Sequence, residues 1–198
     1  MTQKKALIVL TSCNKNLRGG QTGWCLPEAA HPYYVLSGAN YDVTFTSPKG
    51  PNPPVDEGSV QVFKDDAGFL FDPIVAEEYD AVFYAGGHGP VIDLAVDSDN
   101  AKLASEFYRA GKPVSAMCHG PAALVLATDA SGKSIFAGKR FTGFSIAEEE
   151  YANMVDAVPY EKAKELLWAH VVVDGHLLTG QNPASANPLA EKLVKMLK

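Results

Sequence analysis

The sequence predicts an α/β protein in which helices pack around a mostly parallel β-sheet. Apolar runs of strand length alternate with longer amphipathic segments along the chain, and this alternation is typical of such folds. The 198 residues are 46% hydrophobic and 20% charged, as in a globular protein with a sizeable core. We find no internal repeat and no linker, so we expect a single domain over residues 1–198.

The first half of the chain begins with two expected strands that flank a helix. Buried strands are expected at 5–11 and 41–47, where the sequence is apolar over the length of one strand. The segment 27–39 predicts a helix, because it opens with a proline and ends near a glycine. Residues 48–54 are rich in proline, which resists helix, so we expect an extended or turning segment outside the centre of the sheet.

The second half continues the alternation. Strands are expected at 79–84 and 113–117, on either side of a helix at 100–110. An Asp-Gly pair at 174–175 favours a tight hairpin loop. The remaining expected elements are a short strand at 140–142, a helical turn at 147–154, a hairpin at 170–179 and a terminal helix at 184–198.

Composition and charge exclude several classes of partner. The net charge is −6 and the basic residues are scattered, so we expect no binding to nucleic acid or to anionic membranes. No segment approaches the roughly 18 apolar residues of a membrane span. Cys13, Cys25 and Cys118 have irregular spacing, which indicates neither a disulfide framework nor a zinc site. A cytoplasmic protein without a signal peptide fits these features.

The most informative motif is Ala-Met-Cys-His-Gly at 116–120. A buried strand would deliver Cys118 to a sharp turn, where Gly120 relaxes the backbone. A helix that starts near Pro121 would direct its free N–H groups at the sulfur, and its dipole would favour the thiolate. A buried cysteine is often an ordinary core residue, but the Cys-His-Gly-Pro context favours a nucleophile.

Two neighbouring features are candidate partners of this cysteine. His119 is the nearest imidazole in the sequence and is either a proton acceptor or a side chain packed in the turn. Gly86, Gly87 and His88 follow an expected strand, where small residues let backbone N–H groups approach a ligand. With the His119 amide they could form an oxyanion hole, although a simple tight turn fits the glycines equally well.

Acidic residues occur at two further places. Glu28 lies in the first turn of the helix expected at 27–39, where the helix dipole alone favours a carboxylate. Residues 148–150 are three consecutive glutamates, and such a run is usually a solvated face. One of these three carboxylates could still orient the His119 ring.

With these motifs the chain resembles the DJ-1/PfpI superfamily, whose fold is related to the class I glutamine amidotransferase domain. Within it the closest likeness is to the Hsp31-like group of glutathione-independent glyoxalases, the glyoxalase III type. The residues that carry the resemblance occur in an order that spans nearly the whole chain. They are 22–28, 31–32, 47–50, 79–90, 116–123, 142–150 and 179–186.

The resemblance implies a flavodoxin-like three-layer sandwich and assigns roles to the candidate residues. Cys118 is then the nucleophile, His119 its proton-transfer partner, and Glu149 the group that orients the imidazole, with Glu148 as the alternative. Glu28 is then a carboxyl group close to the sulfur, with a perturbed pKa. The resemblance also implies a cytoplasmic homodimer that needs neither a metal nor an organic cofactor.

The activity implied is conversion of methylglyoxal, a small dicarbonyl, to lactate without glutathione, as a D-lactate dehydratase, with deglycation as a related activity. The alternative is a redox-responsive stress protein or a holdase chaperone without turnover. The chain departs from the pattern at 58–80 and 159–168, where it is shorter than many relatives. If these segments frame the substrate entrance or a dimer contact, the departure affects access and assembly.

Overall fold

A six-stranded sheet forms the centre of the protein. The computed structural model describes residues 3–62, 79–155 and 169–198. The strands lie in the order β2-β1-β3-β4-β6-β5, and every neighbouring pair is parallel except the antiparallel pair β5–β6. Their bounds are β1 Lys5–Val9, β2 Asp42–Thr46, β3 Ala81–Tyr84, β4 Val114–Met117, β5 Val171–Asp174 and β6 Leu177–Gly180. The predicted mostly parallel sheet is confirmed.

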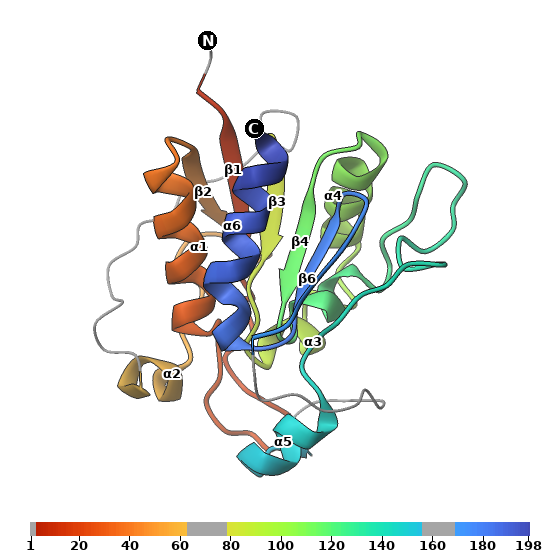
Figure 1. The fold of residues 1–198 in the computed structure, drawn as a ribbon. Helices are drawn as coiled ribbons and strands as arrows, with labels where there is room; N and C mark the ends of the chain where they lie inside the picture. The colour runs from red at the N-terminus through yellow and green to blue at the C-terminus, as the bar shows by residue number, and fades with distance from the viewer. Residues whose placement is uncertain (1–2, 63–78, 156–168) are drawn as a thin grey trace.

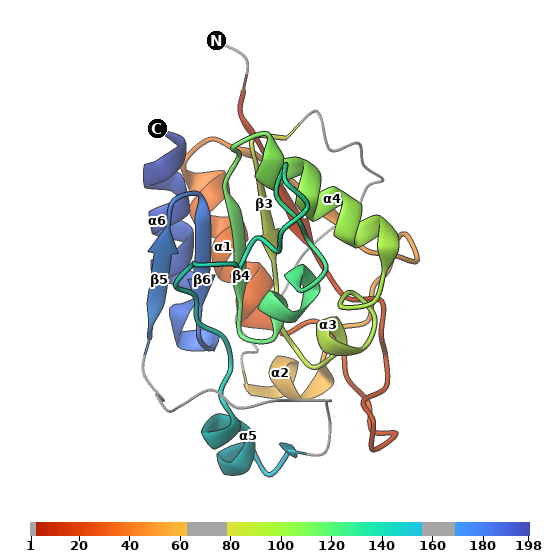
Figure 2. The ribbon, with the colours of Figure 1, turned by 90° about the vertical axis from the view of Figure 1, so that its right-hand side faces the viewer.

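Helices cover both faces of this sheet, which gives three layers. Helices α1 and α6 pack on one face, whereas α3, α4 and η3 pack on the other (Figures 1 and 2). The helical elements are α1 Leu26–Gly38, α2 Glu57–Val62, α3 Gly89–Ile92, α4 Ser98–Arg109, η3 Gly120–Leu124, α5 Ile146–Ala152, η5 Pro183–Ser185 and α6 Ala186–Leu197. This arrangement is the expected flavodoxin-like sandwich.

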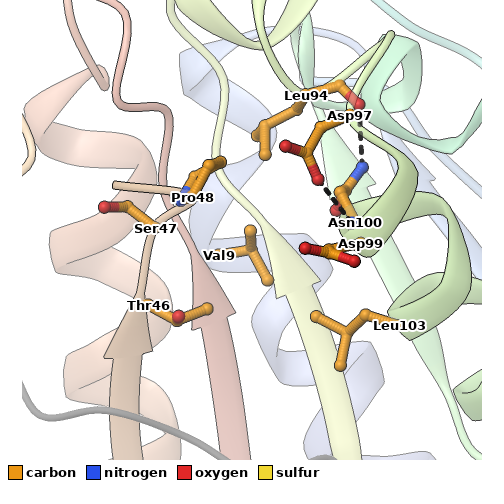
Figure 3. A pocket seen from close by; sticks show the side chains of 9 residues that line it. All are labelled: Val9, Thr46, Ser47, Pro48, Leu94, Asp97, Asp99, Asn100 and Leu103. Atoms are coloured by element: carbon orange, nitrogen blue, oxygen red, sulfur yellow. Dashed lines mark hydrogen bonds between the residues drawn. The ribbon is translucent and has the colours of Figure 1, made fainter. Parts of the chain in front are cut away.

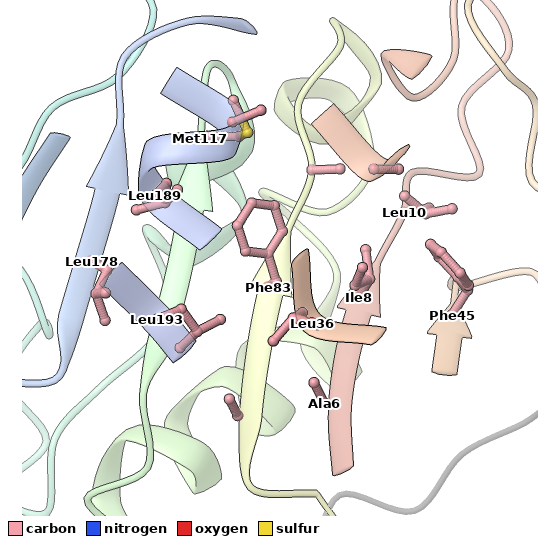
Figure 4. Close-up of a cluster of buried hydrophobic side chains, with 14 of the residues drawn as sticks. Ala6, Ile8, Leu10, Leu36, Phe45, Phe83, Met117, Leu178, Leu189 and Leu193 are labelled. Atoms are coloured by element: carbon pink, nitrogen blue, oxygen red, sulfur yellow. The ribbon is translucent and has the colours of Figure 1, made fainter. Parts of the chain in front are cut away.

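Alternation along the strands divides the core between the two layers. In β1, Ile8 faces α1 and α6, while Leu7 faces the α4 side, because successive side chains point to opposite faces. On the first face, Phe83 lies between leucines of α1 and α6 (Figure 4). Strands that are buried on both faces explain the continuous apolar runs of the sequence.

Most predicted elements occur, and the differences lie in the segments that connect the strands. The strand expected at 140–142 is wrong, because these residues form no ladder and the Arg140 amide instead donates to the Asp174 carboxylate. The helix expected after the cysteine is only the 3₁₀ segment η3. The short helices α2 and α3 were not predicted. The two shortened segments fall mostly on residues 63–78 and 156–168, which lie outside the described residues.

The connections place one end of the sheet over the predicted site residues. Strands β1, β3 and β4 all end on the side where α3 and α5 lie (Figure 1). In α/β sheets, ligands bind at the carboxyl ends of the strands, where the chain order reverses. Here the reversal lies between β1 and β3. Among the described residues, no helix has the length and apolarity needed to cross a membrane.

Candidate active site

Cys118 occupies a strained turn between β4 and η3. Its φ of 53° is in the left-handed region, which non-glycine residues rarely adopt outside functional turns. The turn is held on both sides, because the Cys118 amide donates to Gly180 O at 2.9 Å and its carbonyl accepts the Phe144 N–H at 2.9 Å. A side chain at Gly120 would meet Tyr84 O at 2.5 Å, so glycine is needed there. The sulfur-bearing residue is 5% exposed.

His119 bridges the sulfur and a carboxylate. Its Nδ1 lies 3.3 Å from Cys118 Sγ, and its Nε2 lies 2.6 Å from Glu149 Oε1. The Phe144 ring packs against the imidazole, with 4.8 Å between the centroids. An ionised carboxylate only accepts hydrogen bonds, so Nε2 carries the proton and Nδ1 presents a lone pair to the thiol.

The acid–base character of this pair supports that tautomer. Burial by itself would raise the pKa of Glu149, but hydrogen bonds from His119 and His88 outweigh it and lower the pKa to about 2. Burial lowers the pKa of His119, and the Glu149 hydrogen bond only partly offsets the effect. The resting pair is therefore a carboxylate and a neutral imidazole near neutral pH.

The two glutamates that sequence reasoning left open have different contacts. Glu149 contacts His119, whereas Glu148 caps helix α5 through a reciprocal pair of hydrogen bonds with Ser145. The Glu148 carboxylate also accepts hydrogen bonds from the side chains of Asn182, at 2.8 Å, and Gln181, at 3.2 Å. Glu148 thus anchors α5 to the segment after β6, and this anchor holds Glu149 in position.

The sequence contains a signal that distinguishes the roles of Glu148 and Glu149. Ser145 is followed three residues later by Glu148, which is the capping-box pattern, and the pattern assigns Glu148 to the helix start. Sequence reasoning missed this signal, and it also missed the Phe144 ring beside His119. The asparagine and glutamine partners of Glu148 carry no local signal, because they lie 34 and 33 residues away.

Glu28 is the second buried carboxyl group, on the other side of the sulfur. Its Oε2 accepts the Gly86 N–H at 2.8 Å, while Oε1 has no close hydrogen-bond partner among the described residues. The thiols of Cys118 and Cys25 both interact with this carboxyl group. Burial raises the pKa of Glu28 to about 7, so a large share of the molecules carry a protonated Glu28 at neutral pH.

The pKa of the Cys118 thiol differs from the expectation that a following helix favours the thiolate. Burial, followed by the neighbouring Glu28 and Cys25, raises the pKa of Cys118 well above its ordinary value. The full helix that was expected to stabilise a thiolate does not follow Cys118, because η3 is a single short 3₁₀ segment. The raised pKa favours the thiol form of Cys118 at neutral pH.

The glycine loop after β3 lies against the cysteine. A side chain at Gly86 would meet Glu28 Oε2 at 2.3 Å and Cys118 Cβ at 2.7 Å, so only glycine fits between the two groups. Gly87 has a φ of 91°, and its N–H makes a hydrogen bond to the Cys118 sulfur. His88 is half-buried, and its Nε2 lies 3.4 Å from both carboxylate oxygens of Glu149.

Three of these residues also form a compact set of metal-type donors. One ligand atom each from His88, His119 and Glu149 lies within 4.8 Å of the others, and among the described residues this is the group of three that could hold an ion. However, His119 Nε2 and Glu149 Oε1 are only 2.6 Å apart. Two ligands of a tetrahedral zinc ion would lie about 3.3 Å apart. The observed spacing is that of a hydrogen bond.

The fold and this site define a class: an α/β sandwich with a buried cysteine, histidine and glutamate in one hydrogen-bonded row. The chain belongs to the DJ-1/PfpI family, whose model matches residues 24–196. It is 30% identical over 236 residues to the glutathione-independent glyoxalase HSP31 of Saccharomyces cerevisiae, with full coverage of both chains. It is 29% identical over 231 residues to glyoxalase 3 of Candida albicans, and the alignment covers 96% of this chain and 97% of the Candida protein.

Solved structures give the same result. The crystal structure of glyoxalase III from Candida albicans matches with a TM-score of 0.79 and 25% identity, over 99% of this chain and 98% of that chain. The rapid encystment protein of 24 kDa from Francisella tularensis matches with a TM-score of 0.87 and 28% identity, over 98% and 99% of the two chains. The similarity therefore extends over the whole sandwich.

Proposed function

We propose that this protein is a glutathione-independent glyoxalase that converts methylglyoxal to lactate, with Cys118 as the nucleophile. The observation that carries the proposal is the row Cys118 Sγ–His119 Nδ1 and His119 Nε2–Glu149, which gives a buried thiol a positioned base. The names of the yeast and Candida relatives support the same reaction. The substrate is then a small dicarbonyl.

The first step is addition of the sulfur to the aldehyde. The Cys118 proton passes to His119 Nδ1 while Sγ bonds to the aldehyde carbon, and the proton then moves to the former carbonyl oxygen to give a hemithioacetal. We assign the N–H groups of Gly87, which donates to the Cys118 sulfur, and of His119 as donors to that oxygen as negative charge develops. Protonated Glu28 adds a hydrogen-bond donor beside the sulfur.

The second step moves a proton between the two former carbonyl carbons. His119 removes the proton from the carbon bound to sulfur, which gives an enediolate, and returns it to the adjacent carbon, while the hydroxyl proton passes from the first oxygen to the second. The product is a lactoyl thioester on Cys118. Water then cleaves the thioester, which releases lactate and restores the thiol. Glu149 stays ionised throughout and stabilises the imidazolium that forms in each transfer.

The direct test is a methylglyoxal assay without glutathione, in which lactate is measured for the wild type and for Cys118→Ala. We expect lactate from the wild type and a loss of at least about 10³-fold in the variant, because the variant lacks the sulfur that His119 contacts. The variant removes one buried sulfur atom, so unfolding should remain cooperative. Lactate production that persists in Cys118→Ala would overturn the proposal.

Deglycation of methylglyoxal adducts is a second candidate, favoured by the 27% identity over 172 residues to a deglycase of Pyrococcus horikoshii. The two activities share a nucleophile but differ in what reaches it. An aldehyde trap distinguishes them. If the protein acts only on released methylglyoxal, an excess of the trap stops lactate formation from adducts. If it acts on the adduct, lactate formation continues.

A redox-responsive stress protein or holdase is the alternative without turnover, and it predicts suppression of aggregation that does not depend on Cys118.

We further propose a cytoplasmic homodimer that acts as a single-domain enzyme without a metal or organic cofactor. The net charge of −6 supports the absence of nucleic acid as a partner. Sedimentation at several protein concentrations tests the dimer directly.

A further inference from the structure

Hydrolysis of the lactoyl thioester requires a base that removes a proton from the attacking water. In the thioester the acyl group is bound to Cys118 Sγ, the atom that His119 Nδ1 faces at 3.3 Å. The His119 side chain is 3% exposed and Glu28 has no exposed surface, so neither group is well placed to meet water that arrives from solvent. The site contains a more accessible base, His88, whose side chain is 17% exposed.

His88 is held by the same carboxylate as His119. Its Nε2 lies 3.4 Å from both Oε1 and Oε2 of Glu149, and His119 Nε2 lies 2.6 Å from Oε1. Because the ionised Glu149 carboxylate only accepts hydrogen bonds, Nε2 of each imidazole carries a proton. In the neutral ring of His88, Nδ1 then has a lone pair that can accept a proton. Two imidazoles in the same tautomer therefore share one carboxylate.

The Nδ1 atom of His88 has no hydrogen-bond partner within residues 3–62, 79–155 and 169–198. The contacts of this side chain there are those of Nε2 with Glu149 and the packing of its ring on His119, with 4.9 Å between the centroids. The preceding residue, Gly87, makes an N–H bond to the Cys118 sulfur, so His88 follows directly on a residue that contacts the reacting atom. One nitrogen of this imidazole is anchored, and the other is available to water.

The cavity beside α4 supplies no alternative base. Its volume is about 250 Å³, and it opens between the end of β2 and the first turns of α4 (Figure 3). Its charged groups are Asp99 and Asp97, and Asp97 caps α4 by accepting the Asn100 N–H at 2.7 Å. None of the candidate catalytic residues lines this cavity, so its carboxylates do not belong to the Cys118 site.

We propose that His88 is the base that activates water for hydrolysis of the thioester, while His119 serves the addition and isomerisation steps. This role depends on the glyoxalase reaction proposed for Cys118. Nδ1 of His88 takes one proton from water as the water oxygen bonds to the thioester carbon. The oxyanion that results collapses, the C–S bond breaks, and its electron pair stays on sulfur. The new carboxylic acid gives its proton to the sulfur, which restores the thiol and leaves lactate, and His88 releases its proton to solvent.

The test compares His88→Gln with the wild type in a rapid-mixing assay with methylglyoxal and no glutathione. Samples are quenched in acid, freed of methylglyoxal and treated with hydroxylamine, which converts a lactoyl thioester to lactohydroxamate but does not do so with a hemithioacetal. We expect His88→Gln to form the thioester within about threefold of the wild-type rate, whereas kcat falls by about 10²-fold and the thioester accumulates. Glutamine keeps an N–H donor for Glu149 but has no basic nitrogen, so a role in positioning alone would leave kcat close to that of the wild type.

His176→Gln is the matched control, because His176 Nε2 contacts Tyr108 O outside the site, and this variant should turn over as the wild type does. Urea unfolding checks that each variant is folded, and His88→Asn replaces His88→Gln if the latter is not. His88 is not the hydrolytic base if its variant turns over without accumulated thioester, or if thioester formation slows as much as turnover. In both cases lactate from the wild type leaves the glyoxalase proposal standing, whereas a wild type that forms neither thioester nor lactate overturns both proposals.

Discussion

Two buried glutamates lie on opposite sides of the same cysteine and histidine, and their acid–base characters are opposite. Glu28 and Glu149 both occupy the first turn of a helix, α1 and α5, and both are fully buried. Yet the pKa of Glu28 rises to about 7, and that of Glu149 falls to about 2. The Glu149 carboxylate faces two imidazoles, whereas Glu28 faces one amide and two sulfur atoms.

The difference shows that the neighbours, and not the residue type or the position in a helix, decide what a buried carboxyl group can do. Burial raises both pKa values, and only Glu149 has enough hydrogen-bond donors to reverse the effect. One group therefore serves as a proton-bearing donor beside the sulfur, and the other as a permanent anion behind the base. Separated pKa values of this kind are how one site performs both acid and base chemistry at a single pH.

The largest effect is expected from Glu149→Gln. The glutamine amide can donate to His119 Nε2, which moves the ring proton to Nδ1 and blocks transfer from the thiol. We expect kcat for lactate formation to fall by about 10³-fold or more, with a small change in KM. Kinetics without glutathione and a thermal unfolding curve for the same variant provide the measurement. A kcat within about tenfold of wild type would show that Glu149 does not orient the ring.

The next effect concerns the pH dependence of stability in Glu28→Gln. The pKa of Glu28 in the fold is about 7, above its ordinary 4.5, so the bound proton stabilises the fold fully below about pH 4.5. That contribution, about 3 kcal/mol, is lost as the pH rises through about 7. Glutamine cannot titrate and should lack this loss.

Urea unfolding of both proteins at several pH values between 5 and 8.5 measures the difference. The Glu149 contribution has the opposite sign, since it is present above its ordinary pKa and is lost as the pH falls toward 2. It is shared by both proteins, so subtraction isolates Glu28. Parallel stability curves for wild type and Glu28→Gln would contradict the raised pKa.

The sequence could predict some features of the site and not others. The apolar runs predicted β1 to β4 and the position of Cys118 after β4, because burial on both faces leaves a strong local pattern. The Asp-Gly turn predicted the β5–β6 hairpin, whereas the strand expected at 140–142 does not form. The pairing of Glu149 with His119 followed from the family resemblance. The positive φ of Cys118, the raised pKa of its thiol and the neighbours of Glu28 depend on contacts between distant segments, which no local pattern encodes.

A smaller effect on kcat is expected from Glu148→Ala, which tests whether Glu148 anchors helix α5 or acts in the chemistry. This change removes the carboxylate that accepts hydrogen bonds from Ser145, Asn182 and Gln181. We expect a loss of about 1–3 kcal/mol in the free energy of unfolding, measured in urea, and a change in kcat of less than about tenfold for the folded protein. If kcat instead falls as far as in Glu149→Gln, the contacts of Glu148 are needed to hold Glu149 against His119.

The smallest effect tests the environment of Glu28 through Cys25. The Cys25 thiol interacts with the Glu28 carboxyl group and lowers its pKa, although burial dominates. Above about pH 7 the Glu28 carboxylate should form beside the sulfur and reduce kcat/KM, so the wild type should show a falling limb there. Cys25→Ala should move that limb to higher pH by a few tenths of a unit, and Glu28→Gln should abolish it.

Cys13→Ala is the matched control, because the Cys13 thiol instead donates to Lys15 O. A limb that stays in place in Cys25→Ala, or that moves equally in Cys13→Ala, would show that Cys25 does not tune the Glu28 proton.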